Sequence, residues 1–110
     1  MPFDAIVTHP GRLEILIALA RCGRDEFVAL RSTTRLTDGN LASHARRLAT
    51  AGLIQIDKQF RAGKPVTSFT LTRAGRLALE SHVQKLNAAI ATPMPQAVAE
   101  DNSAAEEWID

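Results

Sequence analysis

Hydrophobic side chains along the first ninety residues follow two different periods, and the change of period separates predicted helices from predicted strands. In residues 10–22, apolar residues recur at intervals of three and four, which predicts a helix with one buried side. Pro10 suits the first helical position, and Gly23 suits a stop after the last turn. The repeating positions that we expect on the inner face are Leu13, Leu16, Ile17 and Ala20.

A second, shorter helical pattern follows in residues 25–34. Asp25 is a favourable N-cap, because its carboxylate can accept from the free backbone N–H groups of a first turn. Phe27 and Leu30 fall on one side of this helix and are expected to face the core. We expect the helix to end near Thr34, within the polar stretch "RSTTRLT" that forms a turn.

The third helix is expected to begin at Thr37 or Asp38, both favourable N-caps, and to end at Gly52. At about 100° per residue its apolar side chains form one narrow arc, and His44 lies at the border of that arc. The residues of the arc are Leu41, Ala45 and Leu48. The opposite side of the helix is polar and basic, so its role depends on what it contacts.

After Gly52 the period changes from helix to strand. Alternating residues predict a half-buried strand in residues 53–60 and a second strand in residues 67–71, joined by the turn "RAGKPV". The residues expected on the buried side are Ile54, Ile56 and Phe60, then Thr67, Phe69 and Leu71. Together these strands predict one β-hairpin with a basic tip that contains Lys58, Arg61 and Lys64.

Thr72 is a candidate cap for a long fourth helix, Arg73–Ala91. Leu77 and the start of this helix are expected to pack on the first helix. Further along, an apolar stripe too long for the small core to cover repeats at i, i+4, i+7 and i+11, and such a stripe would promote aggregation if left exposed. The stripe therefore predicts a homodimer formed by Leu79, Val83, Leu86 and Ile90, and the alternative is a helix packed along its own domain.

Charge divides the chain into two parts. Residues 1–91 contain all 13 lysines and arginines and seven of the 12 acids, whereas residues 92–110 contain five acids and no base. The second part also has two prolines and many alanines, which favours disorder. We therefore expect one domain in residues 1–91, followed by an acidic and mostly disordered tail in residues 92–110, and the basic domain suggests a polyanionic partner.

Several other classes of protein find little support in the sequence. A single cysteine, Cys22, rules out an intramolecular disulfide, and we expect it to be a small buried residue of a cytoplasmic protein. The alternative is a redox switch, because Arg21 and Arg24 lie beside it. The longest apolar run is far shorter than a membrane span. His9, His44 and His82 lie on separate elements without metal-ligand spacing to the cysteine. With no catalytic motif, we expect neither an enzyme nor a bound cofactor.

The order helix, helix, turn, helix, hairpin, long helix is that of a winged helix-turn-helix. The chain resembles the winged-helix transcriptional regulators, close to the MarR-like and ArsR-like groups, over roughly residues 9 to 80. The matching segments are "HPGRLEIL", "LTDGNLASH", "L..AGLI", "K.F", "P.T" and "LTRAGR.AL". The resemblance implies an α+β, mostly α, fold with a three-helix core, a β-hairpin wing and a long C-terminal helix. Ala45 departs from it, because such helices usually carry a larger apolar residue there.

In this class of fold the third helix enters the major groove of DNA and the wing contacts the backbone or the neighbouring minor groove. Arginine and asparagine can bond base edges in two places at once, and lysine neutralises phosphate. Alternatives remain open for some residues: a solvated helix face for Arg46 and Arg47, helix packing for His44, and a salt bridge for Lys58. The candidate DNA-binding residues are Thr37, Gly39, Asn40, Ser43, His44, Arg46, Arg47, Lys58, Arg61 and Lys64.

The sequence thus predicts a DNA-binding transcriptional regulator that acts as a homodimer on an inverted-repeat operator. The alternative is a winged-helix module for protein–protein contact without DNA binding. The polar third helix argues against it, because a protein-binding helix usually exposes aromatic or aliphatic anchors. A small-molecule effector between the first and fourth helices would be an addition to the first function rather than a rival to it.

Overall fold

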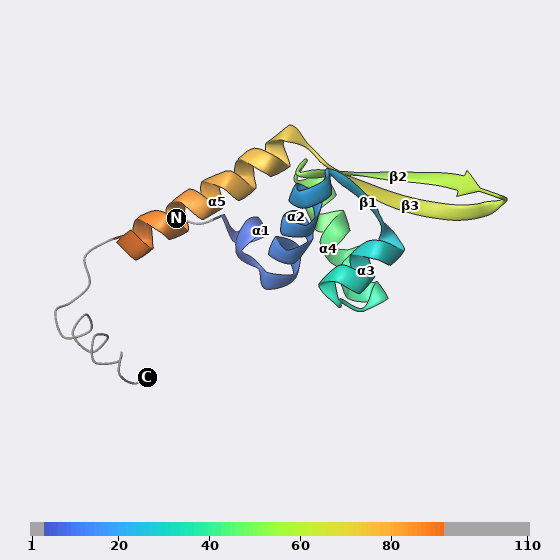
Figure 1. Ribbon diagram of the computed structural model, residues 1–110, viewed down its shortest axis with the longest axis horizontal. Coiled ribbons are helices and arrows are strands. Elements are labelled where there is room, and N and C mark those ends of the chain that lie inside the picture. Colours follow the sequence, from blue (N-terminus) through green and yellow to red (C-terminus); the bar gives the residue numbers. More distant parts are fainter. Residues whose placement is uncertain (1–3, 92–110) are drawn as a thin grey trace.

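The computed structural model describes residues 4–91, in which the helices gather at the base of a three-stranded antiparallel sheet and the hairpin projects beyond them (Figure 1). The elements are α1 (Ala5–Thr8), α2 (Pro10–Cys22), β1 (Arg24–Glu26), α3 (Phe27–Thr34), α4 (Asp38–Thr50), β2 (Ile54–Arg61), β3 (Lys64–Leu71) and α5 (Arg73–Ala91). This is the predicted mostly helical α+β winged helix, with α1 and β1 as elements that the sequence pattern did not predict. The predicted tail, residues 92–110, lies outside the described residues.

Helix α2 is the central helix and contacts α1, α3, α4, α5 and the sheet. Its predicted bounds are confirmed, and the His9 side chain caps it by accepting from the backbone N–H of Gly11 at 3.1 Å. The predicted inner face is partly wrong, because Ile17 is 40% exposed. A helix this apolar that meets neighbours on several sides has no single buried stripe. The buried residues of α2 are Gly11, Ile15, Leu16, Ala18 and Leu19.

The segment before α3 is a strand rather than a helix cap. Asp25 lies in β1, which pairs with β3, and its carboxylate accepts from the backbone N–H of Glu26. The prediction that Asp25 caps the second helix is therefore wrong. The reason is tertiary, since a three-residue strand forms only where β3 offers a free edge. Helix α3 does end at Thr34 as predicted.

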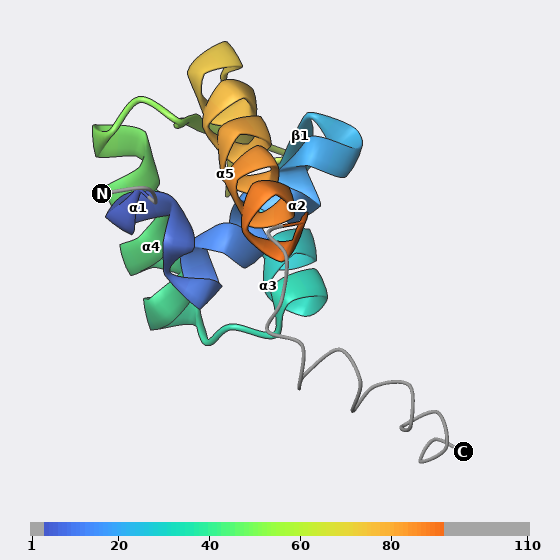
Figure 2. The same cartoon turned by 90° about the vertical axis from the view of Figure 1, so that its left-hand side faces the viewer.

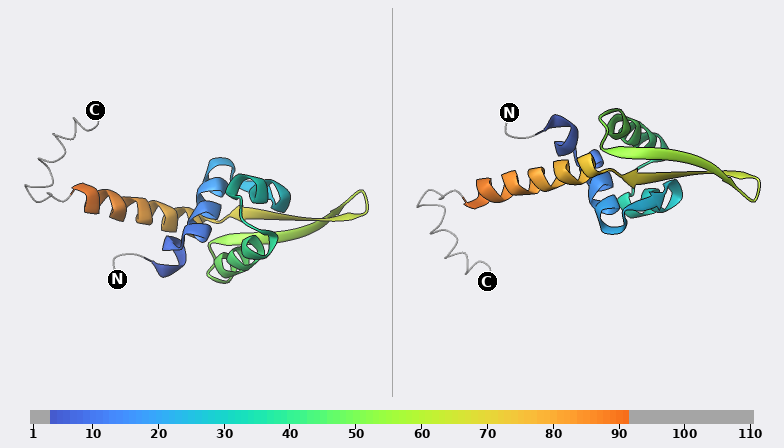
Figure 3. Two further views of the ribbon diagram at one scale, coloured as in Figure 1. Left: turned by 90° about the horizontal axis from the view of Figure 1, so that it is seen from below. Right: turned by 90° about the horizontal axis from the view of Figure 1, so that it is seen from above.

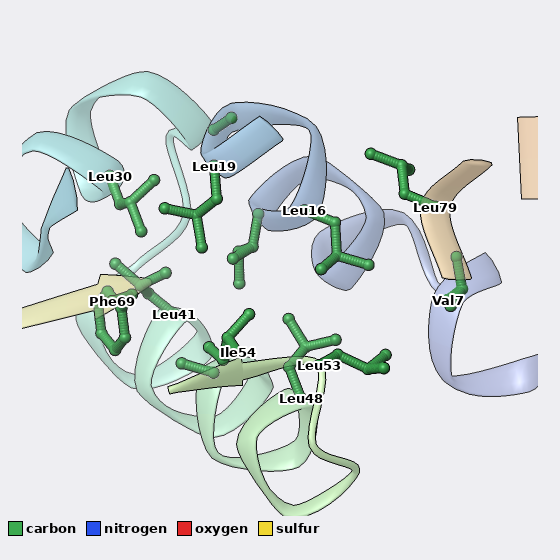
Figure 4. Close-up of a cluster of buried hydrophobic side chains, with 13 residues drawn as sticks. Val7, Leu16, Leu19, Leu30, Leu41, Leu48, Leu53, Ile54, Phe69 and Leu79 are labelled. Atoms are coloured by element: carbon green, nitrogen blue, oxygen red, sulfur yellow. The ribbon is translucent and has the colours of Figure 1, made fainter. Parts of the chain in front are cut away.

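One hydrophobic core connects α2, α3, α4, the base of the hairpin and the start of α5 (Figure 4). The predicted arc of α4 is confirmed, because Leu41, Ala45 and Leu48 are each at most 1% exposed. At the far end of this core, Leu79 of α5 lies beside Val7 of α1 (Figure 4). A helical turn that was not predicted therefore covers the start of α5.

The hairpin projects past the helices on the side opposite to α5 (Figure 3). Its register pairs Ile56 with Phe69 near the base and Phe60 with Pro65 near the tip. The two-residue turn places Ala62 and Gly63 at positive φ, 55° and 79°, which is the backbone twist that tight hairpins require. The predicted hairpin is confirmed, but Phe60 is 77% exposed rather than half-buried, because it lies beyond the reach of the core.

Helix α5 begins at a junction with the end of α4. Thr72 donates its backbone N–H to Leu53 O and its hydroxyl to Gly52 O, and its hydroxyl oxygen accepts from the N–H of Gly75. The predicted Thr72 cap is thus confirmed. Helix α5 then crosses in front of α2, with α1 and α4 to one side and α3 to the other (Figure 2). Leu77 does not pack inward as predicted and is 53% exposed, because it points away from α2.

Candidate nucleic-acid interface

Helices α3 and α4 form a helix-turn-helix whose short turn is closed by local hydrogen bonds. Arg35 adopts a left-handed conformation after α3 and donates its N–H to Arg31 O. The hydroxyl of Thr37 then accepts from the N–H of Asn40, which caps α4 as predicted. Thr37 therefore has a structural role as the N-cap of α4, whether or not it also contacts DNA.

Opposite its buried arc, α4 presents an exposed polar surface that we name the reading face. None of its residues is needed for the core, and Arg46 lies on its hairpin side. Its members among the predicted site residues are Gly39, Asn40, Ser43, Arg46 and Arg47, all of which are exposed. The predicted residues of α4, apart from Thr37 and His44, are therefore brought together on one accessible surface.

Acids near this surface are held by arginines from other elements. Asp38, at the start of α4, pairs with Arg31 of α3 at 2.8 Å. This ion pair offsets the negative charge that would otherwise meet a phosphate. The sequence did not predict it, because Arg31 and Asp38 lie on different helices and only the angle between those helices brings them together.

The hairpin makes two further ion pairs with β1: Asp57 pairs with Arg24, and Arg61, at the turn end of β2, pairs with Glu26. The hydrogen bond from Arg61 lowers the pKa of the Glu26 carboxyl and raises that of Arg61 itself. Arg61 is therefore engaged with a neighbour, and a DNA contact would have to compete with Glu26.

Of the five basic side chains among the predicted DNA-binding residues, four have no counter-charge in the described part of the chain. Within residues 4–91, no acid lies at ion-pair distance from Arg46, Arg47, Lys58 or Lys64. The salt bridge considered for Lys58 is absent from this part of the chain, since the acids near it are paired with arginines. Unpaired cations attract polyanions without first having to break a contact.

His44 packs against the start of α2 instead of joining the reading face. Its ring lies 4.5 Å from the ring of His9, centroid to centroid, and directly over Gly11. Gly11 is buried and leaves no room there for a β-carbon, which would lie 2.8 Å from the imidazole. Of the two interpretations of His44, this placement favours helix packing.

Burial, followed by the charges of His9 and Arg12, lowers the pKa of His44 below the ordinary value of 6.5. The folded protein then binds a proton less readily than the unfolded chain, so stability falls as the pH drops below about 6.5 and levels off below the folded pKa. We expect the free energy of unfolding, measured by urea titration from about pH 8 to about pH 5.5, to decrease with a slope that His44→Gln reduces. Equal slopes for both proteins would contradict this assignment.

A groove of about 180 Å³ separates α4 from the hairpin. Its floor is apolar, and Arg46 and Lys58 lie at its edge on opposite walls. Ala45 belongs to the floor, so the small residue that departs from the winged-helix pattern leaves open space beside α4 rather than a gap in the closed core. The full lining is Phe27, Ala42, Ala45, Arg46, Ile56, Lys58, Thr67 and Phe69.

Other sites suggested by residue type are not assembled. Cys22 is exposed, so the prediction that it is buried is wrong; it ends α2, where the chain turns at Gly23 toward β1. Residues 4–91 contain no cluster of three or more histidines, cysteines or acids that could hold a metal ion. None of the helices described there combines the length and apolarity needed to cross a bilayer.

A helix-turn-helix with an exposed polar reading face, a hairpin beside it and unpaired cations on both defines a DNA-binding winged helix. Comparisons with known proteins agree with this class: a family model described as winged helix DNA-binding domain matches residues 12–90. The chain belongs to this family, whose members are DNA-binding regulators and typically not enzymes.

Three proteins illustrate what this chain is similar to. An uncharacterized protein of Methanocaldococcus jannaschii is 31% identical over 84 residues, which span 76% of this chain and 87% of that protein. The structure of a transcriptional regulator homologue from Pyrococcus horikoshii is 32% identical with a TM-score of 0.74, covering 79% of this chain and 86% of that one. A MarR-family regulator from Silicibacter pomeroyi shares the fold, with a TM-score of 0.59 at 14% identity over 93% of this chain and 74% of its own.

Proposed function

We propose that this protein is a sequence-specific transcriptional regulator that binds an inverted-repeat operator as a homodimer in the cytoplasm. The observation that carries the proposal is the distribution of charge around α4. Asp38, the one acid of α4, is paired with Arg31, whereas Arg46 and Arg47 of α4 and Lys58 of the hairpin face turned toward it remain unpaired within the described residues. Such a surface attracts phosphate and keeps its reading side chains available for base edges.

Helix α4 is suited to the major groove, which is wide enough to admit one helix. Asn40 can make paired hydrogen bonds with adenine, and Arg46 and Arg47 can do so with guanine. Ser43 can reach a base edge or a phosphate. Gly39, which meets no other heavy atom within 4 Å of where a β-carbon would stand, allows close approach of the backbone near the start of the helix.

The hairpin supplies contacts that depend little on sequence. Lys58 and Lys64 are exposed and unpaired in the described part of the chain, and they can neutralise phosphates beside the half-site. Arg61 can add a contact at the expense of its ion pair with Glu26.

Dimerisation is proposed to use the part of α5 that runs beyond the domain. Leu79, the first residue of the predicted stripe, is buried in the core of its own chain. The same side of the helix then becomes uncovered: Val83 is 46% exposed, Leu86 41% and Ile90 73%. A second copy packed on this surface would bury it and place two reading faces about 34–36 Å apart, one turn of DNA.

In this proposal, residues 1–91 are the DNA-binding and dimerisation domain and residues 92–110 an acidic tail. Selection of bound sequences from a random DNA pool tests the function directly. We expect enrichment of an inverted repeat with half-sites roughly one helical turn apart. Failure to enrich any sequence, together with a partner protein that binds α4, would favour the protein–protein alternative.

Arg46→Ala and Arg47→Ala are each expected to weaken binding to the selected operator and to relax one base position, at a cost of about 1–3 kcal/mol. Lys64→Ala should instead weaken binding to all sequences about equally, because a phosphate contact carries no base information. Titrations against operator and scrambled duplexes at fixed salt distinguish the two effects. Arg21→Ala, which removes an exposed arginine outside the reading face, is the matched control. If both α4 variants bind like the parent, α4 does not read DNA.

A further inference from the structure

The hairpin has two faces of different chemistry, as the alternation of side chains along paired strands requires. One face, which we name the groove face, looks toward α4, because Ile56, Lys58, Thr67 and Phe69 line the groove together with Arg46 of that helix. Paired positions of the register extend this face from base to tip. It comprises Ile54, Ile56, Lys58 and Phe60 on β2 and Leu71, Phe69, Thr67 and Pro65 on β3.

The opposite face of the hairpin carries its ion pairs. Asp57 and Arg61 are on this side of β2, bonded to Arg24 and Glu26 from β1, and Lys64 follows on β3. The residues that the sequence suggested for the tip of the wing, Arg61 and Lys64, therefore face away from the side shared with α4. Near the tip, the side chain that the groove face presents to a ligand spanning α4 and the hairpin is therefore neither Arg61 nor Lys64.

That residue is Phe60. It is 77% exposed, more than any other large hydrophobic side chain in residues 4–91, and lies about 7 Å beyond Lys58 along the strand. Exposed Pro65 is directly opposite, and the turn consists only of Ala62 and Gly63. Phe60 is thus the largest side chain at the end of a thin ribbon, and its ring serves no core.

We propose that Phe60, supported by Pro65, enters the minor groove that flanks each half-site and partly unstacks a base step there. This inference rests on the proposed DNA binding. A thin hairpin with a small turn suits a groove about 6 Å wide, and an apolar side chain can act as a wedge between bases. Because pyrimidine–purine steps unstack most readily, Phe60 selects such a step outside the segment that α4 reads.

Charge favours DNA over a protein as the occupant of this surface. Phe60 lies two residues from Lys58, and Arg46 borders the same groove from α4, so the apolar ring is the outer end of a cationic surface. Along the groove face Pro65 is the apolar neighbour of Phe60, and it also borders a second hollow toward α3 that Val28 and Val66 line together with Glu26. A protein-docking site usually centres on clustered apolar anchors, whereas Phe60 follows Lys58 on a face whose groove Arg46 also lines.

The experiment compares Phe60→Ala, Phe60→Leu and the parent on the duplex that the parent selects from a random pool. Phe60→Ala should bind that duplex roughly five- to tenfold more weakly, at the low end of the effect of a base–aromatic contact. A repeated selection should retain the bases read by α4 and lose the flanking preference. With 2-aminopurine placed at the flanking step, the parent should raise its fluorescence and Phe60→Ala should not. Phe60→Leu, which keeps apolar bulk, should lie between them, and Leu77→Ala, which trims an exposed apolar side chain on α5, should match the parent.

The possible failures are distinguishable. If the parent enriches no sequence, the proposed function is overturned and this inference with it. If the parent enriches an operator but Phe60→Ala keeps the same affinity and flanking preference, only the role of Phe60 is overturned. The same conclusion follows if Phe60→Ala leaves DNA affinity unchanged and alters the association state of the free protein in light scattering, because Phe60 would then contact protein.

Discussion

Replacement of Val83 and Leu86 together by glutamate is expected to give a folded monomer whose operator affinity is lower by a factor on the order of 10²–10⁴, the loss expected when two linked half-site contacts become independent. Both side chains are more than 40% exposed on α5 beyond the point where it leaves the core. Their replacement should therefore spare folding while placing four like charges at the proposed interface. Light scattering and operator titration measure the two consequences.

A matched control adds the same charges elsewhere on α5. Leu77 and Gln84 are exposed and lie on the other side of the helix, so Leu77→Glu with Gln84→Glu should leave the protein dimeric. Any general effect of added negative charge on DNA binding appears in this control. A parent protein that is monomeric at micromolar concentration would overturn dimerisation by α5.

Gly75→Ala is expected to destabilise the domain by about 3 kcal/mol, at the upper end of the usual cost of overpacking. A β-carbon at Gly75 would overlap the carbonyl oxygen of Leu53 and would lie 2.8 Å from Cδ1 of Leu71. The carbonyl belongs to the backbone and already accepts from Thr72, so it cannot move aside without opening the junction between α4 and α5.

Urea unfolding of the parent and the variant measures this loss. Gly39→Ala is the matched control for a glycine inside a helix, because a β-carbon added there would meet no heavy atom within 4 Å. Because Gly39 is the second residue of α4, alanine there should gain less than the ~1 kcal/mol that it gains over glycine in a helix interior. Equal stability of the Gly75 and Gly39 variants would show that α5 can shift away from Leu53 at little cost.

The same junction matters for the proposed operator geometry. Leu53 donates its N–H to Leu48 O at the end of α4 and accepts from Thr72 at the start of α5. Helix α4 is therefore held to α5 by consecutive hydrogen bonds around Gly52. In a dimer formed by α5, this rigid link would set the spacing and tilt of the two reading faces.

How far the sequence predicted the candidate site differs from residue to residue. Helical periodicity correctly separated the buried arc of α4 from the surface that contains Asn40, Ser43 and Arg46, because a helix with one apolar side has only one way to face a core. It could not assign His44, which lies at the border between the two sides. Contact with His9 and Gly11 decided that position, and those residues are more than thirty positions away.

For the hairpin, the sequence predicted the strands and their two faces, but not where the core ends or which charges pair. Alternation predicted both strands, and it would have placed Phe60 on the same side as Lys58 and apart from Arg61. It could not say that the core ends before Phe60, because the depth of the core depends on where α3 and α4 cross the sheet. The sequence also could not predict the ion pair between Arg61 and Glu26, because that pair requires β1 to lie against β3.

By itself the sequence determined the order and type of the main elements, the caps at Thr37 and Thr72, and the arc that α4 buries. These features are local, because periodicity and capping act within a few residues and each has one strongly favoured outcome. Only the tertiary structure decided which side of α2 is buried, which acids are paired, and where α5 leaves the core. Those outcomes depend on residues far apart in the chain and on the angles at which helices and sheet pack, and local patterns do not encode such angles.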